Sequence, residues 1–156
     1  FLTLDRFPDG RDLWLLATGT GIAPFLSILQ DFEVWQRFER IVLVYSARSF
    51  AELAYQPLIR SFAELEHLAE FAHKLTYLPV VTREQAPDCL SARITELLDS
   101  GELERAAGLA LSPEQSRVML CGNPQMIDDI RQRLKARGLN LSLTRRPGQV
   151  AVENYW

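Results

Sequence analysis

A glycine-containing segment, Thr18-Gly19-Thr20-Gly21, follows an apolar run and precedes Pro24, which suits the first turn of a helix. A turn from a buried strand into a helix presents backbone N–H groups at the positive end of the helix dipole, which favours phosphate binding. The two glycines would let the backbone approach a pyrophosphate closely. The segment matches neither the G-x-G-x-x-G fingerprint nor the P-loop. A phosphate site and a purely steric turn therefore both remain open on the residues alone.

Arginines follow two further apolar runs, where they could bind a second phosphate. Arg48 comes after the run at 41–45, and Thr82-Arg83 comes after the run at 75–81; Arg93 lies further along. A guanidinium suits a phosphate dianion because its planar fork donates two parallel hydrogen bonds. The alternative is that all three arginines are solvated surface charges.

Cys121 ends another apolar run and begins the string Cys121-Gly122-Asn123-Pro124. Taken alone, such a cysteine is more often a buried small hydrophobe than a reactive group, and we do not expect a nucleophile. The chain ends in two adjacent aromatic residues, Tyr155 and Trp156. They could stack on a flat heterocycle or pack on the surface of their own domain.

The composition is that of one globular domain of 156 residues, with 47% hydrophobic and 24% charged residues. A net charge of -3 argues against nucleic-acid binding, and no apolar stretch predicts a membrane span. Cys89 and Cys121 lack the spacing of a zinc site or a disulfide framework, so we expect no metal and a cytoplasmic location. The abrupt start at Phe1 suggests a piece of a longer protein.

Strand-like and helix-like segments alternate along the chain. The predicted strands are 13–17, 41–45, 75–81, 117–121 and 149–152. The predicted helices run from Pro24 to about Trp35, from Tyr55 to Ala69, from Ser91 to Leu98 and from Gln125 to Arg137, and 101–116 stays unassigned. Alternation of this kind predicts an α/β fold, a doubly wound parallel sheet of about five strands flanked by helices in a Rossmann-like arrangement. Ligands bind such sheets at the carboxyl ends of the strands, where the segments described above would meet.

Three segments together resemble the bacterial ferredoxin/flavodoxin-NADP reductase family. Residues 18–25, Thr-Gly-Thr-Gly-Ile-Ala-Pro-Phe, resemble its pyridine-nucleotide loop; the Cys-Gly-Asn-Pro string resembles its Cys-Gly-x-Pro signature; and the ending Val-Glu-Asn-Tyr-Trp resembles its aromatic C-terminus. The resemblance implies that the chain is the NADP(H)-binding, C-terminal domain of such a reductase.

The resemblance also implies roles for individual residues. Arg48, Arg83 and Arg93 would bind the 2′-phosphate of NADP(H), although Ala92 stands where the family commonly has glycine. Tyr155 would cover the flavin ring, and Trp156 would lie by the flavin's adenine. The implied catalytic residues are Cys121, Glu153 and Tyr155, and the implied cofactor-binding residues are Thr18, Gly19, Thr20, Gly21, Ile22, Ala23, Arg48, Thr82, Arg83, Arg93, Gly122, Asn123, Pro124, Tyr155 and Trp156.

On this resemblance, residues 1–10 are the end of a preceding FAD-binding domain or a linker, and residues 11–156 form the NADP(H)-binding domain. The full protein would be a monomeric reductase that transfers a hydride between NADP(H) and FAD and exchanges electrons with ferredoxin or flavodoxin. The chain alone would be inactive in redox turnover, because FAD binds mainly to the other domain. Two alternatives stay open: the reductase component of an oxygenase system, and a non-catalytic NADP(H)-sensing module.

Overall fold

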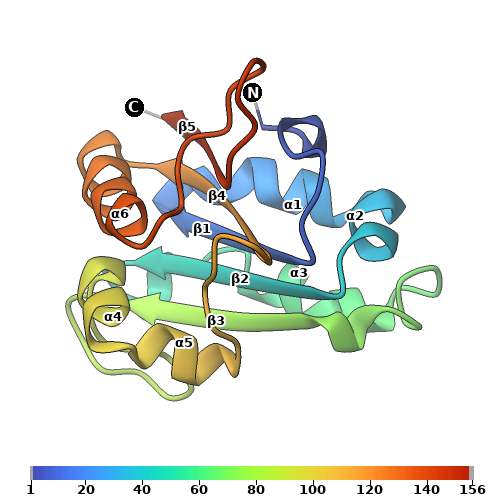
Figure 1. The fold of residues 1–156 in the computed structure, drawn as a ribbon. Coiled ribbons are helices and arrows are strands. Elements are labelled where there is room, and N and C mark those ends of the chain that lie inside the picture. Colours follow the sequence, from blue (N-terminus) through green and yellow to red (C-terminus); the bar gives the residue numbers. More distant parts are fainter. Residues whose placement is uncertain (1, 155–156) are drawn as a thin grey trace.

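The computed structural model describes residues 2–154. The predictions for Tyr155 and Trp156 therefore lie outside the described residues. Figure 1 shows one sheet with helices on both of its faces. The α/β architecture expected from the sequence is confirmed.

The sheet is fully parallel and has five strands in the order β3-β2-β1-β4-β5. The strands are β1 (Asp12–Thr18), β2 (Arg40–Ala47), β3 (Leu75–Val81), β4 (Ser116–Gly122) and β5 (Val150–Asn154). Each overlaps one predicted strand within a few residues. From β1 the chain winds outward through β2 and β3, then returns to the other side of β1 as β4. The carboxyl ends of β1 and β4 are thus the point where the winding direction reverses, which is where open α/β sheets bind ligands.

Side chains alternate between two cores because successive residues of a strand point to opposite faces. Leu13 and Leu15 join a core with helices α1 (Ala23–Leu29), α2 (Phe32–Arg37) and α3 (Gln56–Arg60). Trp14 and Leu16 join the other core, under α4 (Ile94–Ser100), α5 (Glu102–Ala107) and α6 (Pro124–Ala136). In Figure 1 the second group of helices lies in front of the sheet and the first behind it. Burial on both faces explains why the strands read as continuous apolar runs.

Two of the helix predictions were wrong in detail. The helix expected from Pro24 to Trp35 is divided in two, because Asp31 is extended and caps α2 by accepting a hydrogen bond from the Glu33 N–H. The long helix expected over Tyr55–Ala69 is α-helical only at Gln56–Arg60 and continues as a 3-10 helix at Ser61–Glu64. Apolar residues recur in this segment every three positions, which is the period of the 3-10 helix. Among them, Ile59, Phe62 and Leu68 are buried in the core.

The remaining helices follow the sequence more closely. The helix α6 is confirmed, and Gly138 follows it in the left-handed conformation with φ of +84°. The predicted helix at Ser91–Leu98 is α4, which starts later, at Ile94. The unassigned stretch contains α5, a short helix between Gly101 and Gly108. Further 3-10 turns lie at Leu4–Arg6, Gly19–Ile22, Phe50–Glu52 and Ala72–Lys74.

The N-terminal residues pack onto this same domain. Leu2, Leu4 and Phe7 are buried in the core that α1 and α2 cover. Arg37, at the end of α2, donates hydrogen bonds to the carbonyl oxygens of Leu4 and Phe7. Residues 2–7 therefore contribute to the hydrophobic core on the α1 side.

Candidate functional site

The two glycine segments meet at the carboxyl ends of β1 and β4. The Thr18 hydroxyl accepts a hydrogen bond of 3.0 Å from the Asn123 N–H. A Cβ atom on Gly21 would lie 2.7 Å from the Cα of Gly122 and closer still to the Cys121 carbonyl. Gly122, with φ of +140°, would likewise press any side chain against Thr18. Glycine at both positions is therefore required for the backbones of the two segments to touch.

This close approach leaves the outer part of the first turn accessible. Gly19 and Thr20 are exposed, whereas Gly21 and Ile22 are buried, and Gly19 has φ of +55°. The 3-10 turn that contains these residues leads directly into α1, which begins at Ala23. The residues predicted to bind a pyrophosphate are thus placed at one rim of the sheet.

Asn123 caps the helix that follows β4. Its side-chain oxygen accepts hydrogen bonds from the N–H groups of Gln125 at 2.9 Å and Met126 at 3.2 Å. Pro124 occupies the first turn, where its missing N–H costs nothing. The predicted cofactor residues Asn123 and Pro124 therefore also build the start of α6, directly after Gly122 at the end of β4.

Backbone hydrogen bonds join the loops that follow β2 and β3. The Thr82 N–H donates to the Ala47 carbonyl, and the Arg83 N–H donates to the Arg48 carbonyl, both at 3.0 Å. These bonds keep the two chain segments in contact beyond the last paired residues, Ala47 and Val81. Arg48 and Arg83 consequently lie on neighbouring loops at the same edge of the sheet, as the sequence predicts.

Glu52 interacts electrostatically with both of these arginines. Its carboxylate pairs with the Arg48 guanidinium at 3.0 Å, and the Ser49 hydroxyl donates to its other oxygen at 3.2 Å. The Arg48 hydrogen bond is the main cause that lowers the pKa of Glu52, and the charge of Arg83 lowers it further. The sequence reasoning missed Glu52, although the four-residue spacing from Arg48 was a visible signal.

Glu84, which directly follows Thr82 and Arg83, is a second carboxylate at this place, and the sequence reasoning assigned no separate role to it. It accepts a hydrogen bond of 2.5 Å from the Phe50 N–H, which ties the loop after β3 to the 3-10 turn after β2. Phe50 itself is 47% exposed.

Arg93 reaches the same edge of the sheet by a different route. Leu90 pairs with the end of β3, donating to the Pro79 carbonyl and accepting from the Val81 N–H, both at 2.9 Å. Arg93 then stands at the N-cap of α4 and is exposed. Arg93 thus follows the end of β3, but the described contacts do not join it to Arg48 or Arg83.

Cys121 and Glu153 are paired in register across β4 and β5. Cys121 is 1% exposed, and burial raises the pKa of its thiol to about 11, with a further contribution from the charge of Glu153. The thiol is therefore protonated at neutral pH, in line with the expectation that it is no nucleophile.

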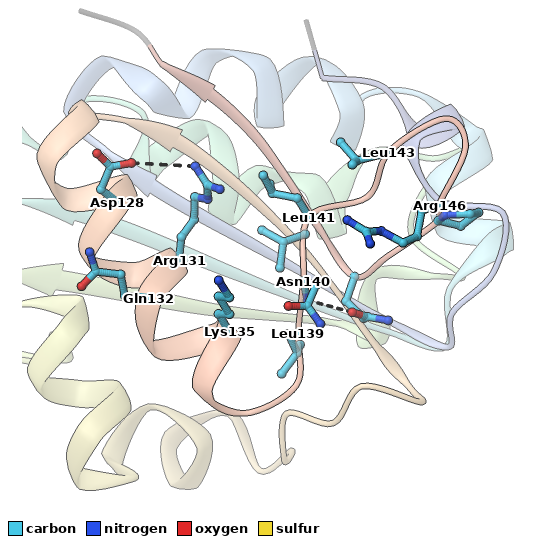
Figure 2. A pocket seen from close by; sticks show the side chains of 12 residues that line it. Asp128, Arg131, Gln132, Lys135, Leu139, Asn140, Leu141, Leu143 and Arg146 are labelled. Carbon is cyan, nitrogen blue, oxygen red and sulfur yellow. Dashed lines mark hydrogen bonds and ion pairs between the residues drawn. The ribbon is translucent and has the colours of Figure 1, made fainter.

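A cavity of about 550 Å³ lies beside Glu153. Residues from the N-terminal segment, from α1 and from the loop after it line it together with Glu153, among them Leu2, Leu4, Ala23, Pro24 and Ile28. A larger cavity, of about 710 Å³, lies elsewhere, between α6 and the segment 139–150 (Figure 2). None of the predicted site residues lines the larger one.

Residues 2–154 contain neither a metal-binding cluster nor a membrane-spanning helix. No three His, Cys, Asp or Glu side chains in this range gather as they would around a metal ion. No helix in the described part of the chain is long and apolar enough to cross a membrane.

Comparison with known proteins places this site in context. The chain is 49% identical over its whole length to a flavodoxin/ferredoxin-NADP reductase from Shigella flexneri, and 44% identical over 97% of its length to ferredoxin-NADP reductase A from Sorangium cellulosum. It covers 61% and 55% of these two relatives, respectively. The chain therefore corresponds to one part of longer proteins.

A solved structure gives the same result in three dimensions. A ferredoxin NADP+ reductase from Neisseria gonorrhoeae, crystallised with bound FAD and NADP, superposes with a TM-score of 0.90 at 41% identity, covering 100% of this chain and 61% of that one. The resemblance to bacterial ferredoxin/flavodoxin-NADP reductases inferred from the three sequence segments is confirmed. The sequence model for the oxidoreductase NAD-binding domain matches residues 15–132. Since this match covers most of the chain, the chain belongs to the oxidoreductase NAD-binding domain family.

Proposed function

We propose that this chain is the NADP(H)-binding domain of a ferredoxin/flavodoxin-NADP reductase. The observation that carries the proposal is the contact between the Gly21 turn and the Cys121-Gly122 backbone. It lies at the carboxyl ends of β1 and β4, where the winding direction of the chain reverses. Two glycine segments held together there, with an arginine-bearing rim nearby, suit a dinucleotide that carries phosphates at two places.

The residues at the rim divide between the two parts of the dinucleotide. Residues 18–23 (Thr18, Gly19, Thr20, Gly21, Ile22 and Ala23) would hold the pyrophosphate, while Gly122, Asn123 and Pro124 would border its nicotinamide side. Arg48, Thr82, Arg83 and Arg93 would bind the 2′-phosphate, which distinguishes NADP(H) from NAD(H). Arg48 and Arg83 lie on loops joined by backbone hydrogen bonds, which supports a shared anion pocket.

Cys121 and Glu153 would border the site of hydride exchange. When bound, NADP(H) and FAD would exchange a hydride there, and FAD would exchange the two electrons singly with the protein partner. The chain's own contribution would be positioning: a protonated, buried Cys121 thiol is a fixed apolar contact for the nicotinamide ring. Tyr155 and Trp156 would contact the flavin.

The full protein would contain an FAD-binding domain ahead of this chain, with residues 1–10 as its end or as a linker and residues 11–156 as the NADP(H)-binding domain. Its electron partner would be ferredoxin or flavodoxin. We propose that it works as a monomer in the cytoplasm and that the chain alone is inactive in redox turnover.

A mixture of NADPH, ferricyanide and the 156-residue chain tests the last point. The absorbance of NADPH at 340 nm is expected to fall no faster than in the same mixture without the chain. A faster fall without added flavoprotein would contradict the proposal.

Nucleotide titrations test the proposal directly. Isothermal titration with NADPH is expected to show at least about a tenfold loss of affinity in Arg48→Ala and in Arg83→Ala. Each substitution removes a guanidinium that would donate charge-assisted hydrogen bonds to the 2′-phosphate. The affinity for NADH should change little in the same variants.

Arg105→Ala is the matched control, since Arg105 is also an exposed arginine but lies on α5. It should bind both nucleotides as the unchanged chain does. Equal losses for NADPH and NADH, or a loss in the Arg105 variant as large as the others, would overturn the assignment of the pocket.

A further inference from the structure

The larger cavity is a groove between one side of α6 and the segment that leads into β5 (Figure 2). Its volume of about 710 Å³ lies within the range of ordinary binding sites. One wall is formed by α6 side chains at positions 128, 131, 132 and 135, and the other by the chain from 139 to 143 and from 146 to 150. The groove is separate from the proposed nucleotide site.

The charged side chains of the groove are mostly basic. Arg131, Lys135 and Arg146 line it, whereas Asp128 is the one acidic lining residue. The Asp128–Arg131 ion pair is long, at 3.9 Å, and within residues 2–154 Lys135 and Arg146 form no ion pair. The excess of positive charge is local, because the chain as a whole carries a net charge of -3.

Two arginines on the other side of α6 do have carboxylate partners. Arg133 pairs with Asp99 at 3.0 Å, and Arg137 pairs with Glu104 at 2.7 Å. Both carboxylates come from the neighbouring helices α4 and α5. Of the cations that face the groove, Lys135 and Arg146 form no ion pair within residues 2–154, so carboxylates from another molecule could pair with them.

Apolar side chains lie between the cations. Leu139 and Val150 are buried at the base of the groove, and Leu141 is partly exposed. Leu143 is 50% exposed, which makes it one of the most exposed large hydrophobic residues of residues 2–154. A ligand that fits must therefore present both negative charge and an apolar group.

The wall opposite α6 is held in one shape by its own hydrogen bonds. Leu143 and Arg146 exchange two backbone hydrogen bonds of 3.0 Å, which closes a tight turn. The Ser142 hydroxyl donates to the Arg6 carbonyl at 2.7 Å and accepts from the Gly148 N–H at 3.0 Å. A prearranged wall reduces the entropy lost on binding.

We propose that this groove binds an acidic peptide segment of a partner protein, one that carries a large apolar side chain. Its carboxylates would pair with Lys135 and Arg146 from the two walls, and its apolar side chain would cover Leu141 and Leu143. The α6 wall from position 128 to 135 extends about 10 Å at 1.5 Å per residue, a length that about three extended residues occupy. The proposal does not depend on the proposed function, because the groove shares no residue with the nucleotide site.

Selection from a random hexapeptide display library against the immobilised 156-residue chain tests the proposal. We expect enriched sequences to combine Asp or Glu with Leu, Ile or Phe. A fluorescein-labelled copy of the most enriched peptide should lose at least about tenfold in affinity when Lys135→Ala and Arg146→Ala are combined, and its binding should weaken as salt is added. In NMR spectra of the unchanged chain, it should shift the methyl signals of Leu141, Leu143 and Val150.

Arg145→Ala is the matched control, because Arg145 belongs to the same turn and does not line the groove. It should bind the peptide as the unchanged chain does. A peptide with Gln in place of its acidic residues should bind at least about tenfold more weakly. NADPH affinity should be the same in all groove variants, so a failure here is distinct from a failure of the proposed function.

Four results would overturn the proposal. The first is a library that yields no acidic sequences, and the second is an Arg145→Ala variant that binds the peptide as weakly as the double variant. The third is that octanoate, a carboxylate with an apolar tail and no peptide backbone, shifts the same methyl signals as strongly as the peptide. The fourth is self-association of the chain in sedimentation that Lys135→Glu abolishes. The last would identify a second copy of this chain as the occupant of the groove.

Discussion

At the scale of single residues, Glu52 competes with any phosphate for the Arg48 guanidinium. The two side chains are joined at 3.0 Å, and the pKa of Glu52 is lowered mainly by Arg48. A bound 2′-phosphate would have to share or displace this partner. Glu52 therefore bears on affinity at the proposed pocket.

Replacing Glu52 by Gln should tighten NADPH binding a few-fold, because the amide no longer neutralises Arg48 and no longer repels the phosphate. Isothermal titration at low salt measures the effect. Glu64→Gln, which removes an exposed carboxylate from a 3-10 turn elsewhere, should leave the affinity unchanged. Weaker NADPH binding in Glu52→Gln would instead mean that Glu52 holds Arg48 in its binding position.

The buried Cys121 thiol makes stability depend on alkaline pH. Its pKa is about 11 in the folded chain, against about 8.5 for an unfolded cysteine. Between these values the folded state keeps a proton that the unfolded state has lost, so the free energy of unfolding falls as pH rises. Below about pH 8.5 the thiol is neutral in both states and contributes no slope.

Urea unfolding at pH 8 and pH 10 measures this contribution in the original chain and in Cys121→Ala. The original chain should lose more stability over this interval than the variant, by at most about 1.4 kcal/mol per pH unit. Comparison with the variant subtracts the lysines and tyrosines that titrate in the same range. Parallel pH profiles would show that the thiol ionises at its ordinary pKa.

At the scale of elements, Asn123 links the proposed site to the stability of α6. Its side chain satisfies two N–H groups of the first turn, while its own N–H donates to Thr18. The cap fixes both the start of α6 and its distance from the β1 turn. Other helices of this fold, such as α4 and α5, have no side-chain cap.

Asn123→Ala should lower the free energy of unfolding by about 1 kcal/mol, because both hydrogen bonds to the first turn are lost. Asn123→Asp should keep most of the stability, since a carboxylate caps equally well. Urea unfolding followed by circular dichroism measures both. If the two variants were equally destabilised, the effect would have to come from the amide nitrogen and not from capping.

At the scale of the whole molecule, Leu2, Leu4 and Phe7 pack into the core on the α1 side. Phe7 is 1% exposed, and Arg37 of α2 holds the backbone beside it. Whatever precedes the chain in a longer protein, this segment is part of the core described here.

Phe7→Ala should lower the free energy of unfolding by about 3–5 kcal/mol, the range for a buried aromatic side chain reduced to a methyl group. Phe50→Ala is the control, because Phe50 is 47% exposed and should cost much less. Urea unfolding measures both. Nearly equal costs would show that the N-terminal segment separates from the core in solution.

The sequence by itself determined the architecture and the order of the strands along the chain. Strands buried on both faces must be continuously apolar, so the runs at 13–17 and 117–121 could be found without a structure. The turn at Gly19–Gly21 was also a local signal, because its cause lies within a few residues.

Only the tertiary structure decided which of those residues touch. The contact between Gly21 and the Cys121 carbonyl joins residues about a hundred positions apart, and no local pattern encodes it. The same holds for the ion pairs of Arg133 and Arg137, which depend on the carboxylates that α4 and α5 bring alongside. Local sequence sets the conformation of a segment through its own backbone and side chains, whereas packing sets its neighbours through the fold as a whole.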